Sequence, residues 1–482
     1  SLNFKIKDMK NKLVAIALSS VVLFGCSKSI DDFGDMNVNP NSTPIPVTSA
    51  LLTNVLSGIG GTASSITPGY YCQYFAQTQY TDESRYTPPQ SDFDGFYSGA
   101  LNDLQNIINV NSDAKYKDLA ALNGSNANQI AIARILKAYY YWIVTDYWGD
   151  VPYTQALKGN SDIAYDKQSA IYPALIAELK AAVAQFNVGI AVKGDIIYAG
   201  NTTKWIKFAN SLRMMMALRL SKVDAAAGKA EFAAALATAN FIDASADNFT
   251  VNYPGGAFNN PWFSNYLTRK DQGVASFVTG MQTANADPRA AAFGSSSVGI
   301  PYGLTRDLAT AFIGANPTWA YVLPASKRAA NSPVIVLSSA QLKFARAEAA
   351  KLGWTSENAA TLYANGVKEN MTDWGVFSQT AYDAYMLKVA LNGTDDLKLI
   401  NTEAYLAFYP NGFQGWSNWR RSGFPVLTPT TYAANASKQI PRRYMYGTRE
   451  YSTNSKNVTA AAANYSGADG VNSSDAKVWW DK

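Results

Sequence analysis

The carboxylate pairs are the side chains whose spacing in this sequence could support acid–base catalysis. Three pairs lie close together along the chain: Asp82 with Glu83, Asp92 with Asp94, and Asp395 with Asp396. Two carboxylates a few ångströms apart, one of them protonated, can hydrolyse a glycosidic bond. Each pair, however, is read more simply as a solvated turn. Because the strand–helix repeat of an enzyme barrel is also lacking, we predict that the protein is not an enzyme.

Other catalytic and metal-binding chemistry is restricted by two residue types. The 482 residues include no histidine, and the cysteines are Cys26 and Cys72. Without imidazole there is no Ser-His-Asp triad, no Cys–His pair and no histidine general base. Two cysteines cannot form a zinc cluster or a disulfide framework. A Gly-x-x-x-x-Gly-Lys-Ser/Thr phosphate loop and EF-hand spacing are absent too. We predict no cofactor and no metal site, although loop Asp and Asn oxygens could hold calcium.

The charge distribution argues against a nucleic-acid partner. The net charge of +5 comes from 41 Lys and Arg against 36 Asp and Glu. Residues 1–25 hold four lysines and one aspartate, so the rest of the chain carries 37 minus 35, or +2. Basic residues gather only in short pairs such as Arg420–Arg421 and Arg442–Arg443. We therefore predict no nucleic-acid binding.

Helical periodicity dominates the chain and would position any binding residues. Apolar residues recur at helical spacing in eight segments: 126–148, 166–186, 202–220, 229–241, 339–352, 357–374, 380–391 and 396–408. Between them lie irregular stretches at 59–99, 250–270, 294–338 and 422–481, with one possible short strand at Val334–Leu337. Structureless loops of this length are uncommon, so we expect them to be ordered by packing and to carry function.

The segments 339–352 and 357–374 resemble a tetratricopeptide unit. Small residues at Ala345, Ala347 and Ala349 would let two helices approach closely, and Leu362–Val367 supplies the facing side. No strict repeat period holds over the whole chain. We predict an all-α fold in which tetratricopeptide-like helix pairs form a superhelical scaffold, with long irregular loops that bind ligand.

The N-terminal residues predict export and lipidation. From Met9, two lysines precede an apolar run of 12 residues at 13–24, which is too short to span a bilayer. Gly25 followed by Cys26 closes this run and resembles a bacterial lipobox, in which the cysteine is acylated; an ordinary signal peptide is the alternative. We predict an upstream extension with a signal peptide at 1–25, acylated Cys26 and a flexible tether at 26–45, and a single domain at 46–482.

Several blocks of sequence resemble signatures of the SusD/RagB family, nutrient-binding surface lipoproteins of Bacteroidetes. The block at 139–153 reads YYYWIVTDYWGDVPY, and TKWIKFANSLRM follows at 203–214. The alanine-rich block 344–354 comes next in the expected order, followed by WSNWRRSGFP at 416–425 and IPRRY at 440–444. No single block is decisive, but the ordered set covers nearly the whole chain and looks closest to the SusD-like subgroup.

The resemblance implies a role in nutrient import at the outer membrane. Family members are anchored at the cell surface by lipid and act as a hinged lid on a SusC-like TonB-dependent transporter. We therefore expect capture of an oligosaccharide, with a peptide ligand of the RagB kind as the alternative. A surface glycoside hydrolase is less favoured. A fimbrial subunit or adhesin would usually read as β-rich, which this chain does not.

Three loop segments combine the ring faces and hydrogen-bonding groups that sugar recognition requires. The family's known binders carry an aromatic arc on loops in comparable regions. We therefore predict as ligand-binding residues Tyr80, Arg85, Tyr86, Asn260, Trp262, Tyr266, Trp319 and Tyr321. For any single ring, packing in the core or a loop is the competing interpretation. With no side chain whose unperturbed pKa is near neutrality, ligand affinity should change little between about pH 6 and 8.

Aromatic and basic residues of the signature blocks are expected to be structural. We predict that Trp142, Tyr147 and Trp148 pack in a helix-on-helix core. The arginine pairs at 420–421 and 442–443 should form structural ion pairs with buried carboxylates rather than bind acidic ligands or a partner barrel.

Overall fold

The computed structural model describes residues 45–88 and 90–482, of which Val47–Lys482 form one compact unit. The predicted signal peptide, Cys26 and most of the predicted tether lie outside the described residues. In the first half the helices are α2 (Thr48–Ala63), α3 (Ile66–Tyr71), α4 (Asp94–Phe96), η2 (Tyr97–Leu101), α5 (Asn102–Ser112), α6 (Lys117–Ala120), η3 (Ala121–Asn123), α7 (Asn126–Trp148), α8 (Gln168–Gln185), α9 (Thr202–Arg219) and α10 (Ala225–Ala237).

In the second half the helices are η4 (Ser245–Asp247), α11 (Pro261–Asn265), α12 (Ser276–Asn285), α13 (Ala290–Phe293), α14 (Arg306–Ala315), α15 (Ser339–Lys351), α16 (Ala359–Asp373), α17 (Gln379–Val389), α18 (Asp396–Phe408), α19 (Gly412–Ser422), α20 (Thr448–Thr453) and α21 (Ser455–Ala462). The strands are β1 (Phe75–Gln77), β2 (Gln90–Ser91), β3 (Phe249–Val251), β4 (Gln272–Val274), β5 (Val334–Leu337), β6 (Met445–Tyr446), β7 (Ser466–Gly467) and β8 (Gly470–Val471).

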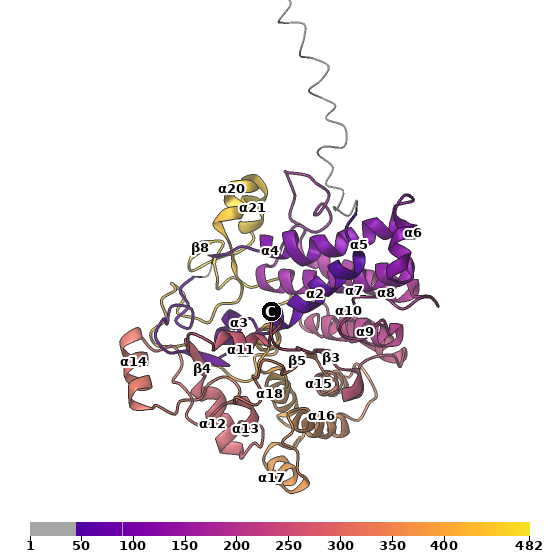
Figure 1. Cartoon of the computed structure of the whole chain (residues 1–482). Helices are drawn as coiled ribbons and strands as arrows, with labels where there is room; N and C mark the ends of the chain where they lie inside the picture. The colour runs from indigo at the N-terminus through magenta and orange to yellow at the C-terminus, as the bar shows by residue number, and fades with distance from the viewer. Residues whose placement is uncertain (1–44, 89) are drawn as a thin grey trace, which may run out of the picture. The chain divides into compact units, whose positions relative to one another are not determined.

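The helices pack in neighbouring pairs, as the tetratricopeptide-like prediction requires. Helix α7 contacts α5 and α8, α8 contacts α9, and α9 contacts α10 and α15. Helix α15 then packs on α16 and α18, so one continuous stack runs through the unit (Figure 1). The all-α prediction is confirmed. Among the helices of the described ranges, none has both the length and the apolar composition needed to cross a lipid bilayer.

Helix α7 lies at the centre of this stack because it is apolar on nearly every side. It has the predicted bounds and ends at Gly149, whose φ of 88° falls in the left-handed region that favours glycine. A Cβ at this position would also lie 2.2 Å from the hydroxyl oxygen of Tyr465. The glycine therefore both ends the helix and lets the chain pass beneath the Tyr465 ring.

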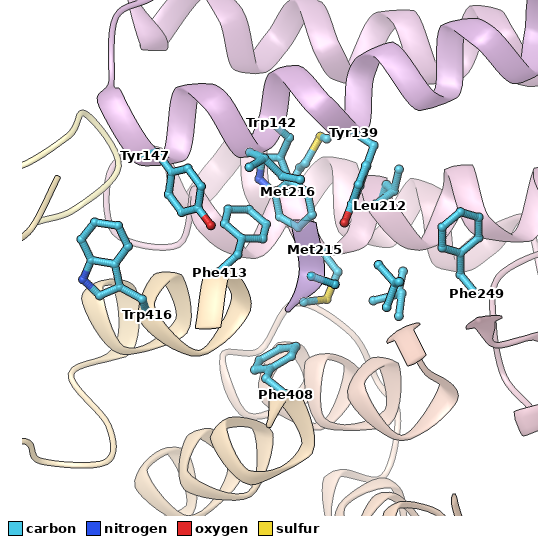
Figure 2. Close-up of a cluster of buried hydrophobic side chains, with 14 of the residues drawn as sticks. Tyr139, Trp142, Tyr147, Leu212, Met215, Met216, Phe249, Phe408, Phe413 and Trp416 are labelled. Atoms are coloured by element: carbon cyan, nitrogen blue, oxygen red, sulfur yellow. The ribbon is translucent and has the colours of Figure 1, made fainter. Parts of the chain in front are cut away.

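The aromatic residues of α7 form a core with α19. Trp142, Tyr147 and Trp148 are buried, as predicted. The rings of Trp142 and Tyr147 meet Phe413 edge-on at 5.3 and 5.4 Å between centroids (Figure 2). Figure 2 also shows Met215 and Met216 of α9 pointing into the same cluster. The signature block thus joins the first helices of the stack to the C-terminal part of the chain.

The paired arginines have structural partners. Arg421 donates two hydrogen bonds, of 2.6 and 2.7 Å, to the carboxylate of Glu348, and Arg442 pairs with Asp481. These two confirm the predicted ion pairs. Arg420 and Arg443 are also buried, but they donate to oxygens that carry no full charge: main-chain carbonyls for Arg420 and the Asn472 amide for Arg443. The buried guanidiniums are therefore not available at the surface.

The strands form small two-stranded pairs and no larger sheet within residues 45–88 and 90–482. The expected strand Val334–Leu337 is present as β5 and pairs antiparallel with β3. Antiparallel β1 and β4 join residues almost 200 positions apart, with Phe75 opposite Val274 and Gln77 opposite Gln272. The irregular stretch 294–338 also contains the helix α14, which we did not expect from the sequence. These elements carry the candidate site.

Candidate ligand-binding site

The β1–β4 pair brings two of the predicted ligand-binding loops together. After Gln77 the chain continues alongside Lys270 and Asp271. The main-chain N–H of Thr78 donates to the Asp271 carbonyl at 2.9 Å, and its hydroxyl donates to the Lys270 carbonyl at 2.8 Å. The Gln79 amide donates to the Asp271 carboxylate at 3.2 Å. Tyr80 therefore lies next to the segment that immediately precedes β4.

Tyr80 is the most exposed of the predicted aromatic contacts, with 48% of its surface accessible. The guanidinium carbon of Arg269 lies 4.9 Å from the ring centre, and that of Arg306, at the start of α14, lies 5.5 Å away. Arg269 also forms an ion pair with Asp271 at 2.7 Å. The ring thus lies between two cations that can donate hydrogen bonds to a ligand's oxygens.

A second aromatic and basic group surrounds Tyr321. Its ring centre lies 5.5 Å from that of Tyr266 and 4.2 Å from that of Trp319. The Lys270 ammonium lies 5.4 Å from the Tyr321 ring centre, and the Arg328 guanidinium carbon lies 5.5 Å from it. Because Arg269 and Lys270 are consecutive, the Tyr80 and Tyr321 groups are neighbours. We call the two groups together the Tyr80–Tyr321 surface.

The rigid part of this surface is its buried base. The Tyr266 hydroxyl donates to the Gln272 carbonyl at 2.7 Å and accepts from the Val322 N–H at 2.9 Å. Burial raises the pKa of this hydroxyl, so Tyr266 remains a neutral hydrogen-bonding group. Trp319 is 6% exposed and supports the half-buried Tyr321 from the side. Tyr266 and Trp319 therefore hold Tyr321 in place.

Two predicted residues of the first loop have different surroundings. Arg85 is half-buried, and its Nε donates to the carbonyl of Tyr432 at 3.0 Å. Tyr86 is fully buried, with its ring 6.2 Å from that of Tyr302. Burial is the main cause that raises the pKa of Tyr86 to about 12. In this structure Tyr86 fixes the loop from inside, and a direct contact with ligand remains a prediction.

Asn260 and Trp262 lie in the interior rather than on the Tyr80–Tyr321 surface. The Asn260 side chain caps α11 by accepting from the N–H groups of Trp262 and Phe263 at 2.8 and 3.3 Å. Its amide donates to the Ser332 carbonyl at 2.9 Å. Trp262 is 1% exposed and packs against Phe75 at 5.1 Å. Both residues line a cavity that is described below.

The cations of this surface were missed by the sequence analysis. Arg269, Lys270, Arg306 and Arg328 each lie within 6 Å of an aromatic ring centre. The first two end an irregular stretch that the sequence analysis had singled out, so their position beside a predicted aromatic loop was a usable signal. Arg306 belongs to the unexpected helix α14, and only the three-dimensional contacts bring it to Tyr80.

A family model described as "Starch-binding associating with outer membrane", of the SusD-like kind, matches residues 40–447. None of the curated proteins matches the chain.

Solved structures of similar fold cover almost the whole chain. A protein described as chitin-binding is 25% identical, with a TM-score of 0.77 over 90% of this chain and 99% of the other. A SusD homolog from Bacteroides fragilis is 22% identical, with a TM-score of 0.78 over 90% of this chain and 100% of its own. A chitin-binding SusD homolog from Flavobacterium johnsoniae is 22% identical, with a TM-score of 0.75 over 90% and 98%.

The family match spans most of the sequence, and the structural likeness extends over the same helices and loops that form the Tyr80–Tyr321 surface. On these grounds, the chain belongs to the SusD-like family of nutrient-binding proteins that associate with the bacterial outer membrane.

Proposed function

We propose that this protein captures glycans at the cell surface and passes them to a SusC-like TonB-dependent transporter. The observation that carries the proposal is the exposed Tyr80 ring flanked by Arg269 and Arg306, in a chain whose family is described as starch-binding. The chitin-binding description of a 25% identical structure gives further support for a carbohydrate ligand.

The proposed recognition combines ring stacking with hydrogen bonds from cations. The face of a pyranose carries C–H groups that pack on an aromatic ring, while its hydroxyls bond to charged and amide side chains. On the Tyr80–Tyr321 surface each exposed ring already has a cation nearby. The Arg269 side chain is 60% exposed and can therefore shift aside at little cost, keeping its donors beside the sugar hydroxyls.

The protein is proposed to bind its ligand without altering it. Each carboxylate pair considered for catalysis has at least one member bonded to another residue: Glu83 accepts from Gln77, Asp94 pairs with Arg449, and Asp396 pairs with Lys351. A hydrolase would need an uncommitted acid and base facing one cleft. These contacts favour a structural use of the carboxylates.

Membrane attachment and transport complete the proposal. Acylation of Cys26 would anchor the protein to the outer membrane, because several acyl chains give firm attachment where one gives only weak binding. A SusC-like barrel would then receive the captured glycan beneath the tetratricopeptide-like helices, and energy would come through TonB. Co-expression of the tagged protein with the barrel encoded beside it tests this partnership by co-purification from outer membranes.

The ligand assignment is tested by isothermal titration calorimetry of the purified protein against maltoheptaose, chitohexaose and a mixture of short peptides. We expect saturable binding of at least one glycan, with no products in chromatography of the recovered sugar. Binding of peptides with no glycan binding would replace the proposed ligand by a peptide. Release of shorter sugars would replace the binding role by an enzymatic one.

A further inference from the structure

A cavity of about 210 Å³ lies in the interior between segments distant in sequence. It is bounded by the end of α2, by α11, by the start of α15, by the end of α16 and by the turn from α18 to α19. By the same kind of measure one water requires only about 10–15 Å³, so this cavity has room for a small organic molecule. It shares no lining residue with the Tyr80–Tyr321 surface.

Three polar atoms in the cavity wall have no hydrogen-bond partner among the described residues: Ser64 Oγ, Trp262 Nε1 and Asn411 Nδ2. The three side chains are buried, with 8%, 1% and 4% of their surface accessible. Buried polar groups in folded proteins almost always have partners, because leaving one unbonded costs its full desolvation. Three such atoms around one cavity indicate a shared partner inside it.

The unpartnered donors are held in fixed orientations. The Asn411 side-chain oxygen accepts from the Gln414 N–H at 3.3 Å and caps α19. Its amide nitrogen is thereby left free for the cavity. Trp262 is fixed by the Asn260 cap of α11 and by the edge-on contact with Phe75. Donors that are already oriented lose little freedom when a ligand binds, which favours affinity.

Aromatic rings and one charge of each sign form the rest of the wall. Tyr409 is stacked on Phe293 at 4.2 Å, and its hydroxyl donates to the Phe293 carbonyl at 2.7 Å. The half-buried Trp374 lies 6.4 Å from Tyr409. Lys327 and Asp373 also line the cavity and balance each other in charge. Apolar ring surface, several donors and no net charge suit a neutral ligand rich in hydroxyls.

We propose that this cavity is a second binding site, which takes a single pyranose ring. Its hydroxyl and ring oxygens would accept from Trp262 Nε1 and Asn411 Nδ2 and bond with the Ser64 hydroxyl. The choice of a sugar over another polyol rests on the proposed glycan function. The ring is either a free monosaccharide or the end residue of a glycan that also contacts the Tyr80–Tyr321 surface.

Nuclear magnetic resonance of ¹⁵N-indole-labelled protein tests the site directly. The Trp262 N–H resonance is assigned by its loss in Trp262→Phe, which keeps an aromatic ring and removes the donor. We expect glucose or N-acetylglucosamine to shift this resonance. By calorimetry, Trp262→Phe and Ser64→Ala should each weaken that binding by about tenfold at most, as for the loss of one hydrogen bond. Tyr71→Phe, which removes another buried and unpartnered hydroxyl outside the cavity, is the control and should leave binding unchanged.

The two sources of the sugar give different patterns. A shift with monosaccharides identifies a free sugar, and a shift with maltoheptaose or chitohexaose alone identifies the end of a chain. If no sugar moves the resonance, or if both cavity variants bind like the unaltered protein, the cavity holds only solvent and the proposal is wrong. If Tyr80→Ala and the unaltered protein bind no oligosaccharide while monosaccharides still shift Trp262, glycan capture fails and the cavity site stands.

Discussion

The guanidinium of Arg269 lies over the ring of Tyr80, with 4.9 Å between its central carbon and the ring centre. The next residue, Lys270, lies over Tyr321 at 5.4 Å. One short segment thus supplies a cation to each of two rings from different loops. The β1–β4 pairing makes this possible, because it fixes the Tyr80 loop alongside residues 270–271.

Loss of the Tyr80 ring should weaken glycan binding without unfolding the protein. We expect Tyr80→Ala to reduce affinity for the glycan identified by calorimetry by about tenfold, the effect of losing ~1.4 kcal/mol of stacking. Because the ring is 48% exposed, the free energy of unfolding should change by less than about 0.5 kcal/mol.

The matched control for this variant is Tyr116→Ala. Tyr116 also has a cation over its ring, since the Lys115 ammonium lies 5.0 Å from the ring centre. It lies between α5 and α6, at the opposite side of Figure 1 from α14. Equal losses of affinity in the two variants would show that Tyr80 is not a specific contact.

The contact between Arg269 and Tyr80 should be weak but measurable in the free protein. A cation over an exposed aromatic ring contributes about 0.5–1 kcal/mol. We expect a double-mutant cycle of Tyr80→Ala and Arg269→Ala, followed by urea unfolding, to give a coupling energy in this range. The cycle cancels the loss of the Arg269–Asp271 ion pair, which occurs with and without Tyr80. A coupling near zero would mean that Arg306 alone occupies the ring face.

The position of the site could be predicted only in part from the sequence. The composition of the loops identified Tyr80 and Tyr321, which lie on the same surface. It could not identify Arg306, because the contact with Tyr80 joins residues more than 200 positions apart. Nor did composition separate rings at the surface from those in the interior. Trp262 and Tyr86 have the same local pattern of aromatic and polar neighbours as Tyr80, yet both are buried.

Helix bounds were predicted best where buried and exposed positions differ clearly in residue type. The predicted ranges 126–148 and 396–408 coincide with α7 and α18. The range 229–241 was displaced by four residues at each end from α10, Ala225–Ala237. That segment consists mostly of alanine, so periodicity cannot locate its ends. The informative signal was Asp224, whose side chain caps the helix by accepting from the Ala227 N–H.

The buried Arg421–Glu348 pair should be far more important for stability than an exposed pair. Both groups are under 10% exposed, and two hydrogen bonds join them. Arg421→Ala leaves the Glu348 carboxylate buried and uncompensated, so we expect a loss of about 3–5 kcal/mol in unfolding free energy. Arg449→Ala breaks the exposed pair with Asp94 and should cost less than about 1 kcal/mol. Chemical denaturation measures both, and similar losses would contradict the argument.

The carboxyl group of Glu450 should make stability depend on pH. Burial is the main cause that raises its pKa, and Tyr165, which donates a hydrogen bond to it, lowers the pKa less. Nearby Asp92 and Asp94 raise the pKa further, while Arg449 lowers it. The folded protein therefore holds this proton more tightly than the unfolded chain does.

The sign of the effect follows from that difference in proton affinity. Below about pH 4.3 the group is protonated in both states and its ionisation contributes nothing. As the pH rises from there through the raised pKa of the folded state, the unfolded chain ionises first and the folded state is destabilised. We expect the difference in unfolding free energy between Glu450→Gln and the unaltered protein to move in favour of the variant over this window. A difference that is constant from pH 4 to 8 would contradict the raised pKa.

Two glycine-to-alanine substitutions in helices should have opposite effects on stability. Gly228 of α10 faces α9, and a Cβ there would lie 2.8 Å from the carbonyl oxygen of Ala217 and 2.7 Å from the Trp354 ring. Because the main chain of α9 cannot move aside cheaply, Gly228→Ala should cost about 1–3 kcal/mol by overpacking.

Gly280 of α12 is exposed, and a Cβ there meets no atom within 4 Å. Gly280→Ala should therefore stabilise the protein by about 0.5–1 kcal/mol through helix propensity. Urea unfolding of the two variants measures both changes. If Gly228→Ala were as stable as the unaltered protein, α9 and α10 would not approach as closely as the structure has them. The close approach of these two helices is what the tetratricopeptide-like stack depends on at this point.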